Sequence, residues 1–418
     1  MSADGRGVPH GEALPFKLLA TVWLPFACGY FLSYGFRSIN AVIAPELVRD
    51  LGVNPSQLGL LTSAYFFSFA LFQLPLGLLL DRFGPRRVES ALLVCAAAGA
   101  AVFGWSQSLS GLVLGRALIG LGVSACLMAS IKAFVQWFPA ARLATVNGWL
   151  LAAGGVGAMM ASAPVEAALQ WTDWRVLFFC IAACTVAVAA LVFFLVPERR
   201  DAAAQPPLRD LVAGLRTVLA DAGFWRLSLL FSMAQGTFLS IQGLWAAPWL
   251  GDVGEHSRVE VGRILMWIAA AMTLGYATVG NLSDRLARRG IHATTVMNVG
   301  IAVSVLAFAL IASGAARGSV AVWLIYGFCG TSTVLVYPVL TRMYPTALTG
   351  RVTTMTNMIL FVCAFALQWG LGALINLWPV ADGRYPLAAY RAAFAVPLVL
   401  QCCAFAWLLL GKRKAVPR

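Results

Sequence analysis

The chain has 418 residues, of which 60% are hydrophobic and only 11% are charged, whereas soluble domains carry roughly 25% charged residues. Because one membrane-spanning helix needs about 20 apolar residues, the composition allows about twelve spans and excludes a cytosolic enzyme, a nucleic-acid-binding protein and a secreted disulfide scaffold. The formal net charge of +13 must then be explained by where the cations lie along the chain.

Twelve apolar runs follow one another and predict an all-α integral membrane protein with twelve transmembrane helices. The first run is longer than the roughly 7–15-residue core of a signal peptide, so we expect it to remain as a span. Short connections join the runs, except for a segment that mixes charged residues, proline and alanine and separates six spans from six. The predicted spans are 18–45, 56–80, 88–107, 110–137, 143–168, 174–196, 223–249, 259–282, 292–313, 318–341, 352–378 and 387–410.

The positions of lysine and arginine predict the orientation of the chain. An even number of spans places both termini on one side, and most of the cations outside the spans fall on that side, as is typical of cytoplasmic loops. We therefore expect a multi-pass protein of a bacterial cytoplasmic (inner) membrane with both termini in the cytoplasm, which explains the net charge without nucleic acid. The expected parts are a cytoplasmic N-terminus (1–17), an N-terminal six-helix bundle (18–196), a cytoplasmic linker (197–222), a C-terminal six-helix bundle (223–411) and a cytoplasmic tail (412–418).

The sequence offers no motif for catalysis or for a cofactor. All nine cysteines lie inside apolar runs and none forms a CxxC pair, so we expect them to pack as small hydrophobic side chains. HExxH, GxSxG and phosphate-loop motifs do not occur. We therefore expect no enzyme, no metal site and no cofactor, and no self-contained ATP-driven pump.

A short motif occurs once in each half of the chain. GLLLDRFGPRR follows the second span and GNLSDRLARRG follows the eighth, and each has Gly, then Asp-Arg four residues on, then a basic pair. Two repeated six-span halves are one known transporter architecture. The motif residues are Gly77, Asp81, Arg82, Gly84, Arg86 and Arg87 in the first copy and Asp284 and Arg285 in the second.

Over its full length the chain resembles the major facilitator superfamily. The first copy of the repeat is similar to the signature loop of that family, and LGRALIGLGVSA in the fourth span, which contains Arg116, is similar to a second family motif. The resemblance implies two pseudo-symmetric six-helix bundles that rock about a central site by alternating access. It also implies that the loop motif is a latch between the halves; the alternative is that the motif only fixes topology and loop shape. For Arg116 we expect a gating or packing role.

The fifth span offers a weaker signal for export. Its segment AAGGVGAMMASAP is only partly similar to the motif of drug exporters, because it has the glycines but no Gly-Pro pair. This departure counts against an export function without excluding it.

Arg37 is the sharpest candidate for contact with a substrate, because a charge inside a span is costly and is usually functional. With 100° of rotation per residue, Ser33, Arg37 and Asn40 fall on one face of the first span and form a polar stripe. The alternative is that Arg37 extends toward the membrane surface or bonds to backbone carbonyls.

A second cation, Lys132, lies in the fourth span and is another candidate for substrate contact, although a lysine near a span end can also reach toward water. Arg116 lies sixteen residues earlier, which corresponds to about 160° of rotation. On a straight helix, at most one of the two faces the cavity.

The second half offers neutral polar side chains on spans that line the cavity in the family. Such side chains can bond a ligand in a mostly apolar pocket; the alternative is hydrogen bonding between helices. The candidates are Gln235, Gln242, Tyr326, Thr333, Tyr337, Asn357 and Gln368.

Aspartate and glutamate are missing from the middle of every predicted span, so Arg37 and Lys132 are expected to lack internal counter-charges. An uncompensated buried cation is costly, and an anionic substrate would be its natural partner. Glu166, near the outer end of the fifth span, is a candidate for proton coupling, but exchange or facilitated diffusion fits the same charges.

These observations favour a secondary transporter for a small organic anion of the carboxylate type, with uptake favoured. Its expected partners are the solute, the lipid bilayer and a co-transported proton, and the chain is expected to act as a monomer. The alternatives are efflux of a drug or metabolite, including siderophore-like carboxylates, and a non-transporting membrane receptor or sensor.

Overall fold

The computed structural model describes residues 16–139, 142–198, 216–315, 317–345, 348–381 and 383–410. Within these ranges, eleven helical stretches are long and apolar enough to cross a membrane. The longest is α3 (Pro55–Trp105), whose 51 residues are interrupted at Gly84, where φ is 78° and ψ is 162°. A straight helix of that length would measure more than twice the roughly 30 Å of a bilayer core, so α3 supplies two spans and the total is twelve.

The twelve spans confirm the predicted fold class, and their limits agree with the predicted runs to within a few residues. The predicted termini and the linker fall largely outside the described residues. In the N-terminal half the elements are α1 (Phe16–Leu18), η1 (Leu19–Trp23), α2 (Leu24–Leu51), α3, α4 (Leu109–Gly122), α5 (Cys126–Trp137), α6 (Leu143–Met160), α7 (Ala163–Ala168) and α8 (Trp174–Leu195). In the C-terminal half they are α10 (Ala222–Ser240), η3 (Ile241–Trp245), α11 (Ala246–Asp252), α12 (Arg258–Ala287), α13 (Ala293–Ser313), α14 (Val320–Gly330), η4 (Thr331–Leu335), α15 (Val336–Thr341), α16 (Thr349–Ile375) and α17 (Leu387–Leu410).

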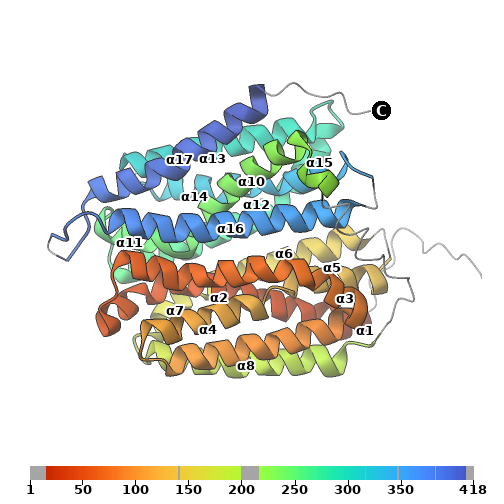
Figure 1. The fold of residues 1–418 in the computed structure, drawn as a ribbon, viewed down its shortest axis with the longest axis horizontal. Helices are drawn as coiled ribbons and strands as arrows, with labels where there is room; N and C mark the ends of the chain where they lie inside the picture. The colour runs from red at the N-terminus through yellow and green to blue at the C-terminus, as the bar shows by residue number, and fades with distance from the viewer. Residues whose placement is uncertain are drawn as a thin grey trace, which may run out of the picture.

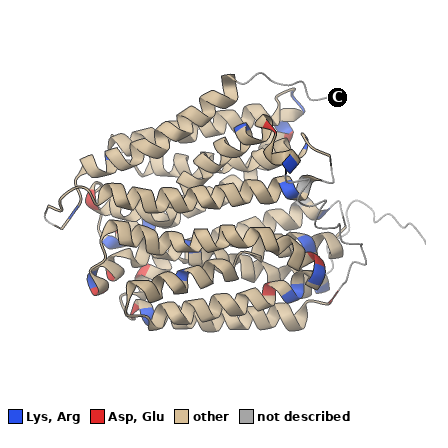
Figure 2. Ribbon diagram, viewed as in Figure 1, with Lys and Arg blue, Asp and Glu red and all other residues tan. Residues whose placement is uncertain are grey.

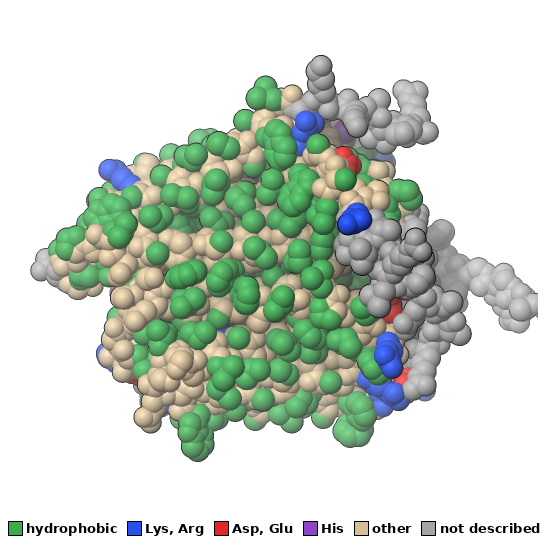
Figure 3. Space-filling view, viewed as in Figure 1, with side chains coloured by type: hydrophobic (Ala, Val, Ile, Leu, Met, Phe, Trp, Pro, Cys, Tyr) green, Lys and Arg blue, Asp and Glu red, His purple; other side chains and the backbone are tan. Residues whose placement is uncertain are grey.

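The two halves lie side by side as two bundles, with α3 and α16 adjacent at their boundary (Figure 1). Apolar side chains are spread over the whole visible lateral face, and charged side chains lie toward its two ends (Figure 3), as expected for a surface in contact with lipid. Charged residues gather at the two ends of the bundles (Figure 2). We call these ends the Gly84 end and the Asn54 end, after the turns that lie there.

Local sequence signals set the helix limits at the Asn54 end. Asn54 accepts a hydrogen bond from the backbone N–H of Gln57, whose side chain in turn accepts one from Asn54. Ser257 and Glu260 form the same reciprocal cap at the start of α12. Such capping boxes satisfy backbone donors that a helix start leaves free, so both halves begin a span here with a defined first turn.

The two halves touch closely toward the Asn54 end. A Cβ atom added at Gly59 in α3 would lie 2.9 Å from the carbonyl oxygen of Gln368 in α16, and one added at Gly372 would lie 2.3 Å from that of Pro55. Only glycine permits such an approach of two backbones. The backbones of α3 and α16 are therefore in direct contact at these two points.

The fourth and tenth spans are both irregular near their middle. The fourth has a turn at 123–125 between α4 and α5, and the tenth has the 3₁₀ segment η4 between α14 and α15. Hydroxyl groups bond the carbonyls that these irregularities affect, as Ser124 does with Leu121 and Thr333 with Gly330. Irregular backbone at membrane depth is tolerated where it lines a cavity, and both segments do so.

Candidate functional site

A central cavity of about 100 Å³ lies between the two halves. Its wall combines side chains from both bundles, including the two irregular segments. Six of the predicted residues line it: Ser33, Arg37, Gln235, Thr333, Tyr337 and Asn357.

Arg37 is the one charged residue among those that line the cavity in the described part of the chain. Its side chain is 6% exposed, and its Nε has no hydrogen-bond partner in the structure. Four aromatic rings surround the guanidinium carbon, at 4.6 Å (Tyr34), 5.9 Å (Tyr65), 5.8 Å (Phe69) and 5.4 Å (Phe361). Aromatic faces stabilise a cation without neutralising it, so the positive charge of Arg37 is available to a bound anion.

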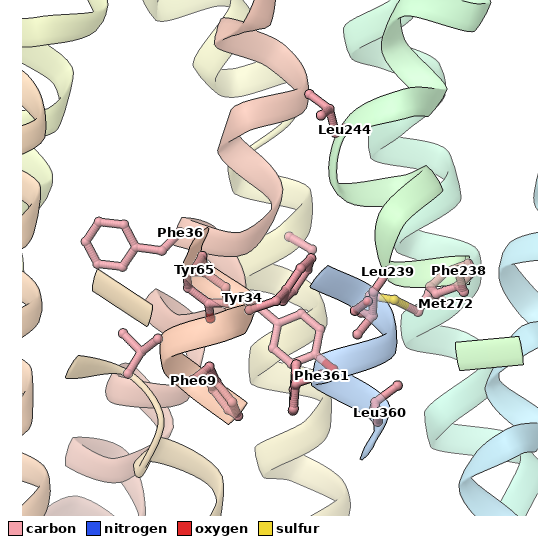
Figure 4. Packing of buried hydrophobic residues seen from close by; sticks show 14 of the residues in the cluster. Tyr34, Phe36, Tyr65, Phe69, Phe238, Leu239, Leu244, Met272, Leu360 and Phe361 are labelled. Atoms are coloured by element: carbon pink, nitrogen blue, oxygen red, sulfur yellow. The ribbon is translucent and has the colours of Figure 1, made fainter. Parts of the chain in front are cut away.

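These four rings come from α2, α3 and α16 and converge on one place in the structure (Figure 4). Phe69 and Phe361 belong to opposite halves, and their ring centroids are 4.1 Å apart. The aromatic surroundings of Arg37 are therefore shared between the two bundles.

Arg116 occupies a different position from Arg37. It is 1% exposed, its Nη1 donates to the carbonyl oxygen of Phe36 at 2.9 Å, and its guanidinium lies 5.2 Å from the Tyr65 ring. This side chain ties α4 to α2 and does not line the cavity, which agrees with a packing role.

Four predicted residues are buried away from the central cavity. The Gln242 amide donates to Ser38 Oγ at 3.3 Å across the two halves. Tyr326 packs between the rings of Phe238 and Phe308. The side chains of Asn40 and Gln368 have no hydrogen-bond partner in the structure.

Lys132 corrects one expectation from the sequence. Its Nζ lies 2.5 Å from Asp81 Oδ1 and 3.0 Å from the carbonyl oxygen of Leu80, and it does not line the central cavity. The flexible side chain reaches the Gly84 end, where an acid is available. The expectation that Lys132 lacks a counter-charge is therefore wrong for this conformation.

The repeated loop motif makes its described ion pairs inside the N-terminal half. Besides Asp81 and Lys132, Arg87 bonds Glu198 at 2.9 Å. A latch between the halves stays a prediction, since the ion pairs of the motif within the described residues do not cross between the halves. Among the other motif residues, Gly77 faces open space, Gly84 forms the positive-φ turn, Arg82 and Arg86 lie over the rings of Phe83 and Phe193, and Asp284 and Arg285 are exposed.

Glu166 contributes to an ion-pair cluster at the Asn54 end. Nη2 of Arg258 in α12 bonds Glu46 in α2 and lies 3.4 Å from Glu166 Oε2 in α7. We call these three residues the outer triad. It joins the two halves beside a second cavity of about 470 Å³, which Arg49, Asp252 and His256 also line.

Glu89 is a buried acid that belongs neither to the ion pairs of the loop motif nor to the outer triad. Glu89 lies near the start of the third span, is fully buried, and has no hydrogen-bond partner for either oxygen in the structure. It packs against Gly29, where an added Cβ would lie 2.3 Å from Glu89 Oε1. The sequence placed Glu89 at a span end but gave no sign of this burial.

Sequence reasoning missed the aromatic part of the site. Tyr30, Tyr34 and Arg37 are spaced as i, i+4 and i+7, which places them on one helix face, and all three line the cavity. That signal was available. The contributions of Phe69, Tyr276 and Phe361 depend on how the spans pack and had no local signal.

Comparison with known proteins decides the family. The sequence model described as Major Facilitator Superfamily matches residues 26–367. The chain belongs to this superfamily. Its relatives are transporters, so it is a multi-pass membrane protein of a solute-transporting family.

Solved structures agree on the fold. A bacterial homologue of the human lysosomal transporter Spinster, in an inward-facing and unoccupied conformation, has a TM-score of 0.74 at 18% identity and covers 96% of this chain and 97% of that one. The D-xylose–proton symporter has a TM-score of 0.71 at 14% identity, with coverage of 96% and 98%.

The matches to curated relatives cover a smaller part of each chain. A probable sulfoacetate transporter of Cupriavidus necator is 25% identical over 62% of this chain and 64% of its own length. The hexuronate transporter of Escherichia coli K12 is 28% identical over 45% and 43%. A chloramphenicol resistance protein of Streptomyces lividans is 29% identical over 65% and 67%. The chain thus matches less than two thirds of the length of the first two.

Proposed function

We propose that this protein is a secondary transporter that moves a small organic anion across the bacterial cytoplasmic membrane, with uptake favoured. The observation that carries this proposal is the buried guanidinium of Arg37 on the wall of the central cavity, with no acid among the lining residues that the structure describes. A planar guanidinium binds a carboxylate or sulfonate with two parallel hydrogen bonds. A bound anion would therefore supply the charge that the cavity lacks.

The names of several relatives support an anionic solute. Sulfoacetate and hexuronate are organic anions, and a relative from Dickeya chrysanthemi, 24% identical over 53% of this chain, is named a galacturonate transporter. Their identities are low, so the support is for the charge of the solute rather than for any one compound.

Alternating access supplies the proposed mechanism. In it, the bundles 18–196 and 223–411 of a single chain rock about Arg37, and the Gly84 end faces the cytoplasm because it carries most of the cations. The close contacts at Gly59 and Gly372 then hold the two halves together on the outer side in this conformation. Solute released from Arg37 would leave toward the Gly84 end.

Uptake into proteoliposomes tests the proposal. Members of a radiolabelled panel of organic acids, which ranges from benzoate and sulfoacetate to galacturonate, should accumulate in vesicles that contain the protein, whereas choline and glucose should not. Arg37→Ala should abolish uptake, and Arg49→Ala should not, because Arg49 lies on the same helix but is 70% exposed and pairs with Asp50. Transport of only neutral or cationic solutes, or normal uptake by Arg37→Ala, would contradict an anion site at Arg37.

Export of a drug-like molecule is a second candidate. The similarity to the chloramphenicol resistance protein and the aromatic lining of the cavity support it. Cells that produce the protein should then lose preloaded chloramphenicol faster than cells that produce Arg37→Ala, and should show no uptake of organic acids.

A further inference from the structure

The polar side chains of the cavity wall are largely bonded to one another. Oε1 of Gln235 accepts from Thr333 Oγ1 at 2.7 Å, and its Nε2 donates to the hydroxyl of Tyr276 at 3.2 Å. Tyr337 donates to the side-chain oxygen of Asn357. The amide of Gln235 and the side-chain oxygen of Asn357 therefore already have partners within the wall.

The N-terminal half shows the same pattern. Nε2 of Gln73 donates to the carbonyl oxygen of Ser124 at 3.3 Å, and the hydroxyl of Ser124 donates to Leu121 at 2.7 Å. Both bonds belong to the irregular segment of the fourth span. The amide nitrogen of Gln73 thus bonds the backbone of the fourth span and is not a free donor for a ligand.

Apart from the hydroxyl groups of Tyr30, Ser33 and Tyr34 near Arg37, the rest of the wall is apolar. Aliphatic side chains from four spans line the cavity together with the aromatic rings around Arg37: Val123, Leu127, Met128, Leu151, Leu239 and Leu360. A hydroxyl group buried against such a surface loses its bonds to water and costs roughly 1–3 kcal/mol when it finds no partner. A solute with several hydroxyl groups would meet this cost repeatedly or would have to break the bonds of Gln235 and Asn357.

Resting on the proposed anion function, we propose that the substrate carries one anionic head and an apolar body, as a branched aliphatic or single-ring aromatic carboxylate does. The head binds Arg37, and the body contacts Leu239, Leu360 and the neighbouring rings. The cavity of about 100 Å³ is smaller than the roughly 150 Å³ apolar cavity that holds benzene in another protein, so in this conformation it limits the body to a compact group. Sugar acids are excluded by the cost of burying their hydroxyl groups.

Calorimetric titration of the purified full-length protein tests this substrate class. Isovalerate and benzoate should bind at least tenfold more tightly than glucuronate and gluconate, and benzamide, which is neutral, should not bind. Leu239→Asn should reduce that preference, because it adds an amide without a partner to the apolar wall. The unfolding temperature of each variant shows that it is folded, and Leu239→Val, which keeps the wall apolar, is the matched control.

The possible failures are distinguishable. If glucuronate or gluconate binds as tightly as benzoate and Arg37→Ala abolishes that binding, the apolar-body inference is wrong and the anion function stands. The inference is also wrong if Leu239→Asn and Leu239→Val leave the same preference. If benzamide binds and the acids do not, or if no acid binds, both proposals are wrong.

Discussion

Two buried arginines touch the same tyrosine ring but differ in what their nitrogen atoms face. The guanidinium carbons of Arg37 and Arg116 lie 5.9 Å and 5.2 Å from the ring of Tyr65. Arg116 uses one nitrogen to bond the backbone of α2, whereas Arg37 faces the cavity. A difference in partners, not in residue type or burial, therefore separates the structural arginine from the proposed binding residue.

Lysine substitutions should separate the two roles. Arg37→Lys keeps the charge but removes the planar fork, so the affinity for an organic acid should fall at least about tenfold, or about 1.4 kcal/mol, with little change in the unfolding temperature. Arg116→Lys should lower the unfolding temperature without a selective loss of affinity. Titration calorimetry and thermal unfolding in detergent measure both effects. Equal affinities for Arg37→Lys and the unmodified protein would show that a point charge is sufficient.

At the scale of the helices, hydrophobic runs located all twelve spans because a bilayer imposes a length and an apolar surface on each one. The hydrophobic runs did not predict which polar residues line the cavity. Asn357 and Gln368 share a face of α16, but eleven residues of helix separate them by about 16 Å along the axis, and only Asn357 is at cavity depth. The rotation was predictable, whereas the depth depends on how the halves pack.

The tenth span shows a second reason for the limit. On a regular α-helix Tyr326 and Thr333, seven residues apart, would share a face, but the 3₁₀ segment Thr331–Leu335 turns faster per residue than an α-helix. Thr333 and Tyr337 line the cavity while Tyr326 packs inside its own bundle. The contact of Lys132 could not be predicted from its own span either, because its partner Asp81 lies on another span.

The close contact between α3 and α16 gives a prediction at this scale. Gly372→Leu should force the Asn54 end apart, because even a Cβ atom there would lie 2.3 Å from the Pro55 carbonyl oxygen. Gly370→Leu is the matched control, since Gly370 on the same helix faces open space. In a cysteine-free background, spin labels at Arg49 and Leu377, which are both exposed, should move apart in Gly372→Leu alone. An unchanged label distance would mean that this contact does not hold the outer side closed.

At the scale of the whole molecule, the outer triad places two acids of one half against one cation of the other. Glu46 and Glu166 are largely buried, with side chains 8% and 11% exposed, and both contact the same nitrogen of Arg258. When the halves separate at this end, Arg258 leaves and the two carboxylates remain together in the N-terminal half. The closed state is thus stabilised by attraction that the open state replaces with repulsion.

The outer triad predicts that acidification shifts the equilibrium between the open and closed states in opposite directions in the unmodified protein and in Arg258→Ala. In the unmodified protein, a proton on either carboxylate weakens the bond to Arg258, so acidification should favour the state that is open at the Asn54 end. In Arg258→Ala, the same proton relieves repulsion, so acidification should favour closure. Distances between the labels at Arg49 and Leu377, measured from pH 8 to about pH 5, distinguish the two responses. A His256→Asn background removes the histidine that lines the same cavity with Asp252. Responses of the same sign in the two proteins would contradict the role of the triad.

Because the triad lies at one end of the molecule, we expect its protonation to change the rate of transport but not the final concentration ratio of the solute. With the Asn54 end facing outward, as we propose, the carboxylates would exchange protons with the external medium alone, and no proton would need to cross the membrane. A more acidic medium would then expose the central site outward more often and accelerate initial uptake. The final ratio of solute inside to outside would not change, because a group that titrates on one side alters rates in both directions and does no osmotic work.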